Sequence, residues 1–254
     1  MKFLSVISLI LVASATTYGS SIISNGGFET LTNPVPDQSA TILEPGSTEL
    51  PGWNVLATHP GGNVLLTMGN SGNIYDTYVE VGNPFDVAVF QAQQGNYFVD
   101  LTGAEGFSGN TLYGGIAQSV ATTVGAAYQL SFWVGKMADD YADPNGNHLY
   151  SGPSMLDLTI GGVNYGLFSN SNSNAAITPN GYPDYLMNWQ QFTVSFSGTG
   201  DPMNIQFINA TPGTNSVVGL DSVDLETITT PEPCTMLLFA AGLAGMAARR
   251  RAAR

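Results

Sequence analysis

The sequence predicts an all-β fold, a two-sheet antiparallel sandwich, flanked by two terminal segments of a different character. Three observations lead to this prediction. The residues from 20 to 228 are rich in Gly, Asn, Ser and Thr, carry few charges and repeat short apolar alternations. Gly, Asn-Gly and Pro turn signals separate these alternations. No stretch with helical periodicity precedes residue 230.

The N-terminal segment, residues 1–19, has the features of a secretory signal peptide. Lys2 is followed by an apolar run, residues 3–12, and then by Ala13-Ser14-Ala15, which fits an Ala-x-Ala cleavage site. A cut after Gly19 is the alternative. The segment predicts export of the chain.

Within the body, the alternation is clearest in residues 128–134 and 191–196, where apolar residues alternate with Gln, Ser, Thr or Trp. A strand with one apolar and one wetter face belongs to an antiparallel sheet that covers a core on one side. The other predicted strands are residues 22–29 (running into a glycine turn), 52–55, 63–68, 75–81, 87–91, 97–101, 115–120, 155–160, 163–168, 204–208 and 217–225.

Two long segments interrupt this pattern. Residues 30–51 contain four prolines and no periodicity, which predicts a surface loop. Residues 138–154 form an acidic loop, in which residues 143–147 resemble a calcium loop. Tyr141 and Gly152 stand where the first and last ligands of such a loop should be. A turn rich in Asn and Asp accounts for the segment equally well.

The C-terminal segment, residues 229–254, combines an open proline-rich stretch, an apolar run and a basic end. Pro231 and Pro233 disfavour helix, whereas residues 236–248 favour it. At about 1.5 Å per residue this run reaches about 20 Å, less than the roughly 30 Å of a hydrocarbon core. We therefore expect a short transmembrane helix with its arginines on the cytoplasmic side. A buried amphipathic helix is the alternative, although no polar stripe crosses the run.

This segment resembles the PEP-CTERM sorting signal of Gram-negative bacteria. The matching residues are Pro231, Glu232 and Pro233, the apolar run, and the cluster Arg249, Arg250 and Arg251. The resemblance implies that an exosortase, a membrane-embedded processing protease, recognises the tail and cuts it near Pro-Glu-Pro. It further implies a cell-surface or extracellular-matrix protein, transiently anchored in the inner membrane. Cys234 is then part of the signal, not a nucleophile.

The body is strongly acidic once these ends are set aside. From residue 20 to 229 it contains one basic residue, Lys136, and eighteen acidic residues, a formal charge of −17. Such a domain will not attract nucleic acid or anionic lipid, and it suits cations and neutral ligands. Because the body has no cysteine, its core or a metal must stabilise it.

Three parts of the body resemble the galactose-binding-like jelly rolls of many carbohydrate-binding modules. They are Asn25-Gly26-Gly27-Phe28-Glu29 with Gly52-Trp53, residues 114–135, and the closing strand, residues 220–225. With residues 95–101 included, the spacing is most similar to the cell-wall family catalogued as domain of unknown function 642. The resemblance implies a jelly-roll sandwich over residues 20–228 that binds polysaccharide.

Glu29 and Asp221 match the positions at which such families often carry a structural calcium ion. Two carboxylates and the carbonyls of a Gly-rich turn are the hard oxygen ligands that Ca²⁺ prefers. In a body with almost no cationic side chain, two acids held close would otherwise repel. A pair of solvated carboxylates is the alternative.

The candidate ligand-binding residues are an aromatic on one strand and a cluster near a turn. Sugar rings stack their apolar C–H faces on aromatic planes, while amides and carboxylates hold the hydroxyls. Trp53 is expected in the core. The candidates are Trp133, whose position in the alternation places it on the wetter face, and Tyr182, Tyr185, Asn188 and Trp189.

Catalysis has little support in the sequence, so a non-catalytic protein is predicted. A hydrolytic triad or thiol nucleophile needs His beside Ser or Cys, and metal hydrolysis needs clustered His ligands. The body has only His59 and His148, in no recognisable motif. Two alternatives to polysaccharide binding stay open: a structural matrix protein without a sugar site, and a two-carboxylate glycoside hydrolase.

Overall fold

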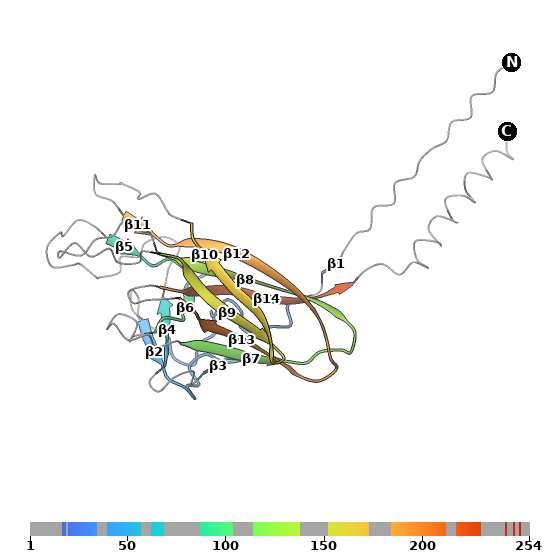
Figure 1. The fold of residues 1–254 in the computed structure, drawn as a ribbon, viewed down its shortest axis with the longest axis horizontal. Coiled ribbons are helices and arrows are strands. Elements are labelled where there is room, and N and C mark those ends of the chain that lie inside the picture. Colours follow the sequence, from blue (N-terminus) through green and yellow to red (C-terminus); the bar gives the residue numbers. More distant parts are fainter. Residues whose placement is uncertain are drawn as a thin grey trace, which may run out of the picture.

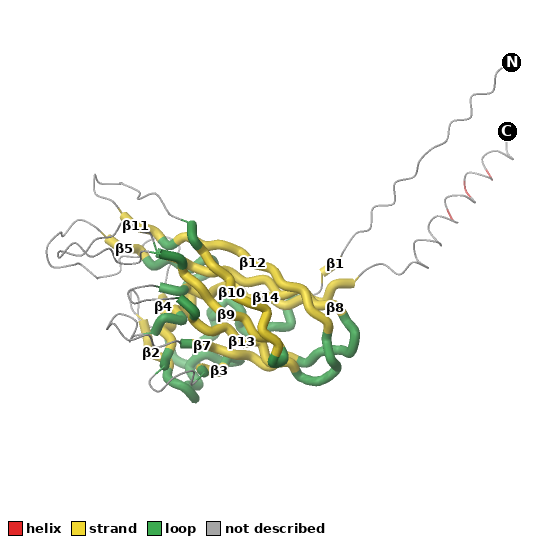
Figure 2. Tube along the Cα trace, viewed as in Figure 1, coloured by secondary structure: helices red, strands yellow, loops and turns green. Residues whose placement is uncertain are grey.

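A computed structural model describes residues 17–18, 20–34, 40–56, 62–68, 87–103, 114–137, 152–172, 184–211 and 217–229, and the single positions 242, 246 and 249. These segments build two antiparallel sheets packed face to face, and strands and loops make up the described part of the body (Figures 1 and 2). The prediction of an all-β jelly-roll sandwich is confirmed.

The larger layer, sheet I, has seven strands. Its strand order is β12-β8-β14-β6-β4-β2, and the short β1 pairs with the end of β14. The bounds are β1 Thr17–Tyr18, β2 Ala40–Leu43, β4 Val64–Met68, β6 Tyr97–Asp100, β8 Ala127–Lys136, β12 Asn188–Ser197 and β14 Gly219–Thr229.

The second layer, sheet II, has five strands in the order β10-β9-β13-β7-β3. The bounds are β3 Asn54–Val55, β7 Gly115–Val120, β9 Ser154–Ile160, β10 Val163–Asn170 and β13 Met203–Asn209. A separate parallel pair joins β5 Val87–Val89 to β11 Asp184–Leu186. Because β7 is followed by β8 and β12 by β13, the chain crosses between the layers as a jelly roll requires.

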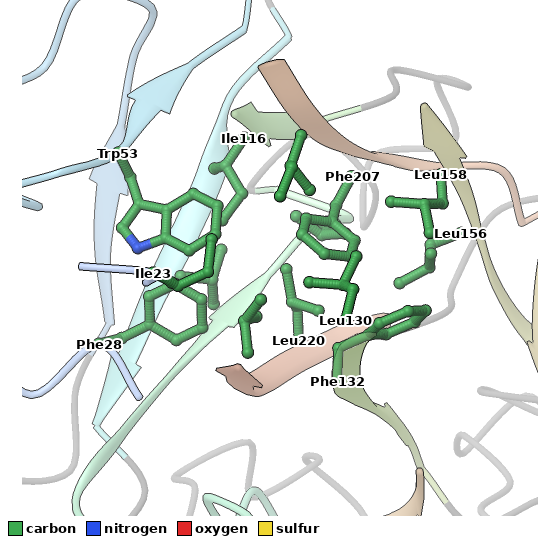
Figure 3. Packing of buried hydrophobic residues seen from close by; sticks show 14 of the residues in the cluster. Ile23, Phe28, Trp53, Ile116, Leu130, Phe132, Leu156, Leu158, Phe207 and Leu220 are labelled. Carbon is green, nitrogen blue, oxygen red and sulfur yellow. The ribbon is translucent and has the colours of Figure 1, made fainter. Parts of the chain in front are cut away.

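The core lies between the two sheets and is built by the alternation seen in the sequence. Tyr128, Leu130, Phe132 and Val134 of β8 are all buried. Phe132 packs against Phe207 of sheet II with ring centroids 5.1 Å apart (Figure 3). Trp53 is 4% exposed, as expected of a core residue.

A second, smaller apolar cluster covers part of the outer face of sheet I. It consists of Phe90, Ala92, Phe98, Met137, Met187 and Val217, with Trp189 packed against it. Most of these residues come from strand ends and connecting segments. No periodic pattern in the sequence indicated this cluster.

Two sequence predictions were wrong in part. Residues 22–29 were predicted as a short strand running into a glycine turn; the turn is present but no strand precedes it in these residues, since Asn25 and Phe28 adopt φ of 53° and 60° and the Phe28 N–H donates to the Asn25 carbonyl. The Asn-Gly-Gly chemistry thus overrides the apolar start. Residues 30–51, predicted as a surface loop, contain strand β2, which pairs with β4. The β-branched residues of β2 favour a strand, but the prolines around them indicated a loop. The predicted strand at 75–81 lies outside the described residues.

The two ends of the body lie side by side. Thr17 and Tyr18 pair with Thr229 and Ile228, at the end of the sandwich opposite β5 and β11 (Figure 1). In the parts of the chain that the structure describes, no helix has the length and apolar character needed to cross a bilayer.

Candidate functional site

Two carboxylates from opposite ends of the chain hold one loop, residues 91–97. Glu29 follows the N-terminal glycine turn, and Asp221 belongs to the last strand. The turn itself is fixed to that strand, because the Val223 N–H donates to the Gly26 carbonyl at 2.9 Å. The turn and the last strand are therefore in direct contact.

Glu29 accepts hydrogen bonds from the far end of the loop. Its Oε1 accepts from the backbone N–H groups of Asn96 at 2.7 Å and Tyr97 at 2.9 Å. Its Oε2 accepts from Asn96 Nδ2 at 3.2 Å. The side chain is exposed, so solvent also reaches this carboxylate.

Asp221 is fully buried and holds the start of the loop. Its Oδ2 accepts from the N–H groups of Gln93 at 2.9 Å and Gln94 at 3.1 Å, and its Oδ1 from that of Ser222 at 2.5 Å. Burial raises the pKa of Asp221 to about 7 against the lowering effect of these donors, and the charge of Glu29 adds to the rise. Near neutral pH this carboxyl is therefore poised between its two protonation states.

Two glycines allow the segments to approach this closely. A Cβ at Gly26 would lie 1.8 Å from the Val223 carbonyl oxygen, and a Cβ at Gly95 would lie 2.4 Å from Glu29 Oε1. Gly95 also has φ of +79°, in the left-handed region. The site thus depends on both glycines, and Gly26 belongs to the motif identified in the sequence.

The donor set at this site fits a hard cation in part. Two carboxylates of like charge approach each other, and carboxylate oxygens retain lone pairs after accepting a backbone N–H. Among the described residues, no group of three or more His, Cys, Asp or Glu side chains is gathered for a metal. The further ligands of a calcium ion would have to be backbone carbonyls, amide oxygens or water.

The outer face of sheet I carries the second group of candidates. By register, Trp133 lies between Gln191 and Asp221, Ser131 between Thr193 and Asp224, and Gln129 between Ser195 and Glu226. The β12 members of these rows are exposed and the β8 members are half-buried. Trp133 is thus placed on the wetter face, as predicted, within an array of amides and hydroxyls.

Trp189 has a packing role on the same face. Its ring lies over two glycines, since a Cβ at Gly135 or Gly219 would come within 2.8 Å or 2.7 Å of the indole Cη2. It stacks edge-on against Phe98 at 5.6 Å, and its Nε1 donates to the Gln91 carbonyl at 2.8 Å. Trp189 therefore anchors the start of the loop and belongs to the small outer cluster.

The other predicted residues are distributed differently. Asn188 is half-buried at the start of β12, where its carbonyl accepts from Asn170 Nδ2 at 3.0 Å and its Oδ1 from Asn172 Nδ2 at 3.5 Å. Tyr185 lies in β11, paired with Ala88. Tyr182 and the acidic loop with its residues 143–147 lie outside the described residues. Among the candidates whose side chains the structure describes, Trp133 and Trp189 lie on one face.

Sequence reasoning missed two buried carboxylates. Asp224 is half-buried, and its Oδ1 is buried with no hydrogen-bond partner among the described residues. Desolvation, and then the charge of Asp224, raise the pKa of nearby Glu226. Asp100 accepts from the N–H groups of Thr102 at 2.8 Å and Val218 at 3.1 Å, and burial raises its pKa to about 6. Both residues follow the strand alternation, which does not distinguish buried from solvated carboxylates.

Comparison with known proteins identifies the C-terminus. Residues 229–251 match the PEP-CTERM protein-sorting motif. They include the predicted processing residues Pro231, Glu232, Pro233, Arg249, Arg250 and Arg251. No curated protein matches the chain in sequence.

Solved structures of similar fold include a cyclase from Fischerella sp. TAU, with 19% identity, a TM-score of 0.50, and coverage of 83% of this chain and 98% of that chain. They also include TmCBM61 in complex with beta-1,4-galactotriose, with 13% identity, a TM-score of 0.38, and coverage of 82% and 98%. A third is the CBM22-1 xylan-binding domain of Paenibacillus barcinonensis Xyn10C, with 15% identity, a TM-score of 0.36, and coverage of 76% and 96%.

Similarity to the cyclase at this level shows a common fold, not a common activity. The sorting motif, in contrast, has a defined meaning, since it marks an exported protein that is sorted through the membrane. The chain therefore carries a PEP-CTERM sorting motif behind an all-β jelly-roll domain, as its C-terminal residues and strand pattern predicted.

Proposed function

We propose that this chain is an exosortase-processed protein of the cell surface or extracellular matrix, and that its jelly roll binds neutral polysaccharide without catalysis. The observation that carries the proposal is the position of Trp133 on the outer face of sheet I. On β8 and β12 its outward neighbours Gln129, Ser131, Gln191, Thr193 and Ser195 are uncharged and polar, whereas on β14 the same rows end in Asp221, Asp224 and Glu226.

This arrangement suits a sugar chain for two reasons. A flat aromatic surface accepts the C–H face of a pyranose ring, while hydroxyls and amides on the same sheet donate and accept hydrogen bonds with its hydroxyl groups. The formal charge of −17 on the body disfavours polyanionic glycans such as polyuronates. A neutral polysaccharide does not meet this repulsion.

Calcium belongs to the same proposal as a structural ion. Glu29 and Asp221 would hold it, and it would replace their mutual repulsion by attraction in a domain that has no disulfide. Its role would be to fix residues 91–97 against the last strand. The ion would not contact the polysaccharide.

The test is retention of the purified protein on insoluble neutral polysaccharides, such as xylan and galactan, and on polygalacturonate. We expect retention on at least one neutral polymer, loss of most of it in Trp133→Ala, and no change in Leu167→Ala. Leu167 is a matched control because it is 58% exposed on sheet II, the opposite layer. Absence of retention on every polymer would remove polysaccharide binding and leave a structural matrix protein.

A further inference from the structure

The free edges of the two sheets differ in how well they are protected against pairing with another chain. Natural sheets block their edges by short strands, charges, prolines or bulges. In sheet II, β3 has two residues, and β10 has a register shift between Asn164 and Gly166. In sheet I, β2 has four residues and is followed by Glu44. Three of the four edges are therefore protected.

The fourth edge, β12, has none of these features. It is ten residues long, and its sequence Asn-Trp-Gln-Gln-Phe-Thr-Val-Ser-Phe-Ser contains no charge, Pro or Gly. Its pairing with β8 runs from Asn188 to Ser197 without a shift. In the part of the chain that the structure describes, β8 is its only partner in the sheet. Such an edge is a regular template for another strand.

The charge distribution limits which partner can approach this edge. Two copies of a body with a formal charge of −17 repel each other over most of their surface. Along β12 itself no charged side chain opposes a second copy, because the strand contains none and its outward side chains Gln191, Thr193 and Ser195 are exposed. Phe192 and Val194 face the core but are only half-buried at the edge. A further strand would cover them.

The strand is also complementary to itself. If two β12 strands run antiparallel with Thr193 opposite Thr193, then Phe192 meets Val194 and Gln191 meets Ser195. Apolar residues then fall on the core side and polar residues on the outer side of both copies, as sheet register requires. This contact uses the same surface on each copy and closes on a two-fold axis.

We infer that β12 is an assembly edge, which pairs antiparallel with β12 of a second copy of this chain and joins two sheets I into one continuous sheet. The two-fold axis is then perpendicular to the sheet, so both Trp133 faces point to the same side. A long polymer could engage both faces, with the gain in avidity that bivalent binding gives. The pairing itself does not depend on the proposed sugar site.

Cysteine cross-linking tests the edge and its register in the full chain, purified in mild detergent with Cys234→Ser as background. Directly opposed antiparallel residues have Cα atoms about 4.5–5.5 Å apart, which a disulfide can span. Thr193→Cys should therefore form a covalent dimer under a mild oxidant such as copper-phenanthroline. Gln191→Cys should not, because its two copies would be offset by about 14 Å along the strand. A mixture of Gln191→Cys and Ser195→Cys chains should cross-link.

Two controls make the outcome decisive. Ser131→Cys lies on the same face but one strand inward, and it should stay monomeric. Sedimentation of the uncut background chain should give a dimer that Thr193→Lys dissociates and Ser131→Lys does not. A monomer at all concentrations, or Thr193→Cys cross-linking no faster than Ser131→Cys, would overturn the inference. Loss of glycan retention with the dimer intact would instead overturn only the sugar site.

Discussion

Glu29 and Asp221 hold opposite ends of the same loop, and the charge of Glu29 contributes to the raised pKa of Asp221. The N-terminal turn, the loop and the last strand thus form one electrostatic unit. The stability of this unit depends on how the repulsion between the Glu29 and Asp221 carboxylates is neutralised. Either a proton or a cation can do this, and the two compete for the same carboxylates.

We expect the metal-free protein to lose stability as pH rises from about 4 to 8. The pKa of Asp221 is raised to about 7 and that of Asp100 to about 6, both above the value of 3.8 in an unfolded chain. Between the unfolded and the folded pKa values, the folded state therefore binds more protons than the unfolded state. The stability that these protons contribute is complete below the unfolded pKa and is lost as pH rises through the folded pKa. At about 1.4 kcal/mol for each pH unit by which a pKa is raised, the two groups together should lower the free energy of unfolding by several kcal/mol. Urea unfolding in chelator at several pH values measures this.

Asp100→Asn is the matched variant for that experiment. Both N–H donors at this residue bond to Oδ1, and an amide oxygen can accept the same two bonds without titrating. In the variant, the free energy of unfolding should depend less steeply on pH between about 4 and 6. The dependence near pH 7, which comes from Asp221, should stay. Stability that rises with pH in chelator would contradict the assignment of both raised pKa values.

Calcium should reverse this dependence. At pH 7–8 we expect added Ca²⁺ to raise the melting temperature, because it binds only the folded arrangement of Glu29 and Asp221. The effect should vanish near pH 5, where a proton occupies Asp221, and calorimetry near pH 7 should detect proton release on binding.

Glu29→Gln should remove the calcium effect, and Asp201→Asn, an exposed carboxylate elsewhere on the surface, should leave it unchanged. A melting temperature that is the same with Ca²⁺ and with chelator at pH 8 would show that the two carboxylates fix the loop without a metal.

Periodicity predicted the parts of the fold that repeat. The alternation at Tyr128–Val134 places every inward residue in the core, and Trp133 on the outer face, as the structure has them. The meeting of Glu29 and Asp221 was predicted from family resemblance, because nothing in a local pattern brings the two ends of a chain together.

The parts that could not be predicted depend on contacts between segments distant in sequence. Trp189 was expected to bind ligand because it lies near a turn rich in aromatics. Its actual environment is set by Gly135 of β8 and Gly219 of β14, which leave room for the ring because the pairing of these two strands places the glycines opposite each other. The burial of Asp100 likewise follows from its position beside Val218, far away in the chain.

Gly26→Ala should severely destabilise the domain, whereas Gly27→Ala should be tolerated. A methyl group at residue 26 would overlap the Val223 carbonyl oxygen at 1.8 Å and break the contact between the turn and the last strand. At residue 27 the nearest atom is Glu29 Cγ at 3.9 Å. We expect a loss of more than about 3 kcal/mol for the first variant and less than about 1 kcal/mol for the second. Denaturant unfolding compares them, and equal losses would mean that the turn does not need this close approach.

Alanine variants of the two tryptophans on sheet I should separate stability from binding. Trp189→Ala removes a ring that stacks on Phe98, covers two glycines and donates to Gln91, so it should cost about 3–5 kcal/mol of unfolding free energy. Trp133→Ala should cost less, since the residue paired with it on β12, Gln191, is exposed and polar, and it should instead reduce polysaccharide retention. Thermal unfolding and retention measured on the same preparations make the comparison. If folded Trp133→Ala retains polysaccharide as well as Leu167→Ala does, then Trp133 is not a binding residue and the polysaccharide face lies elsewhere.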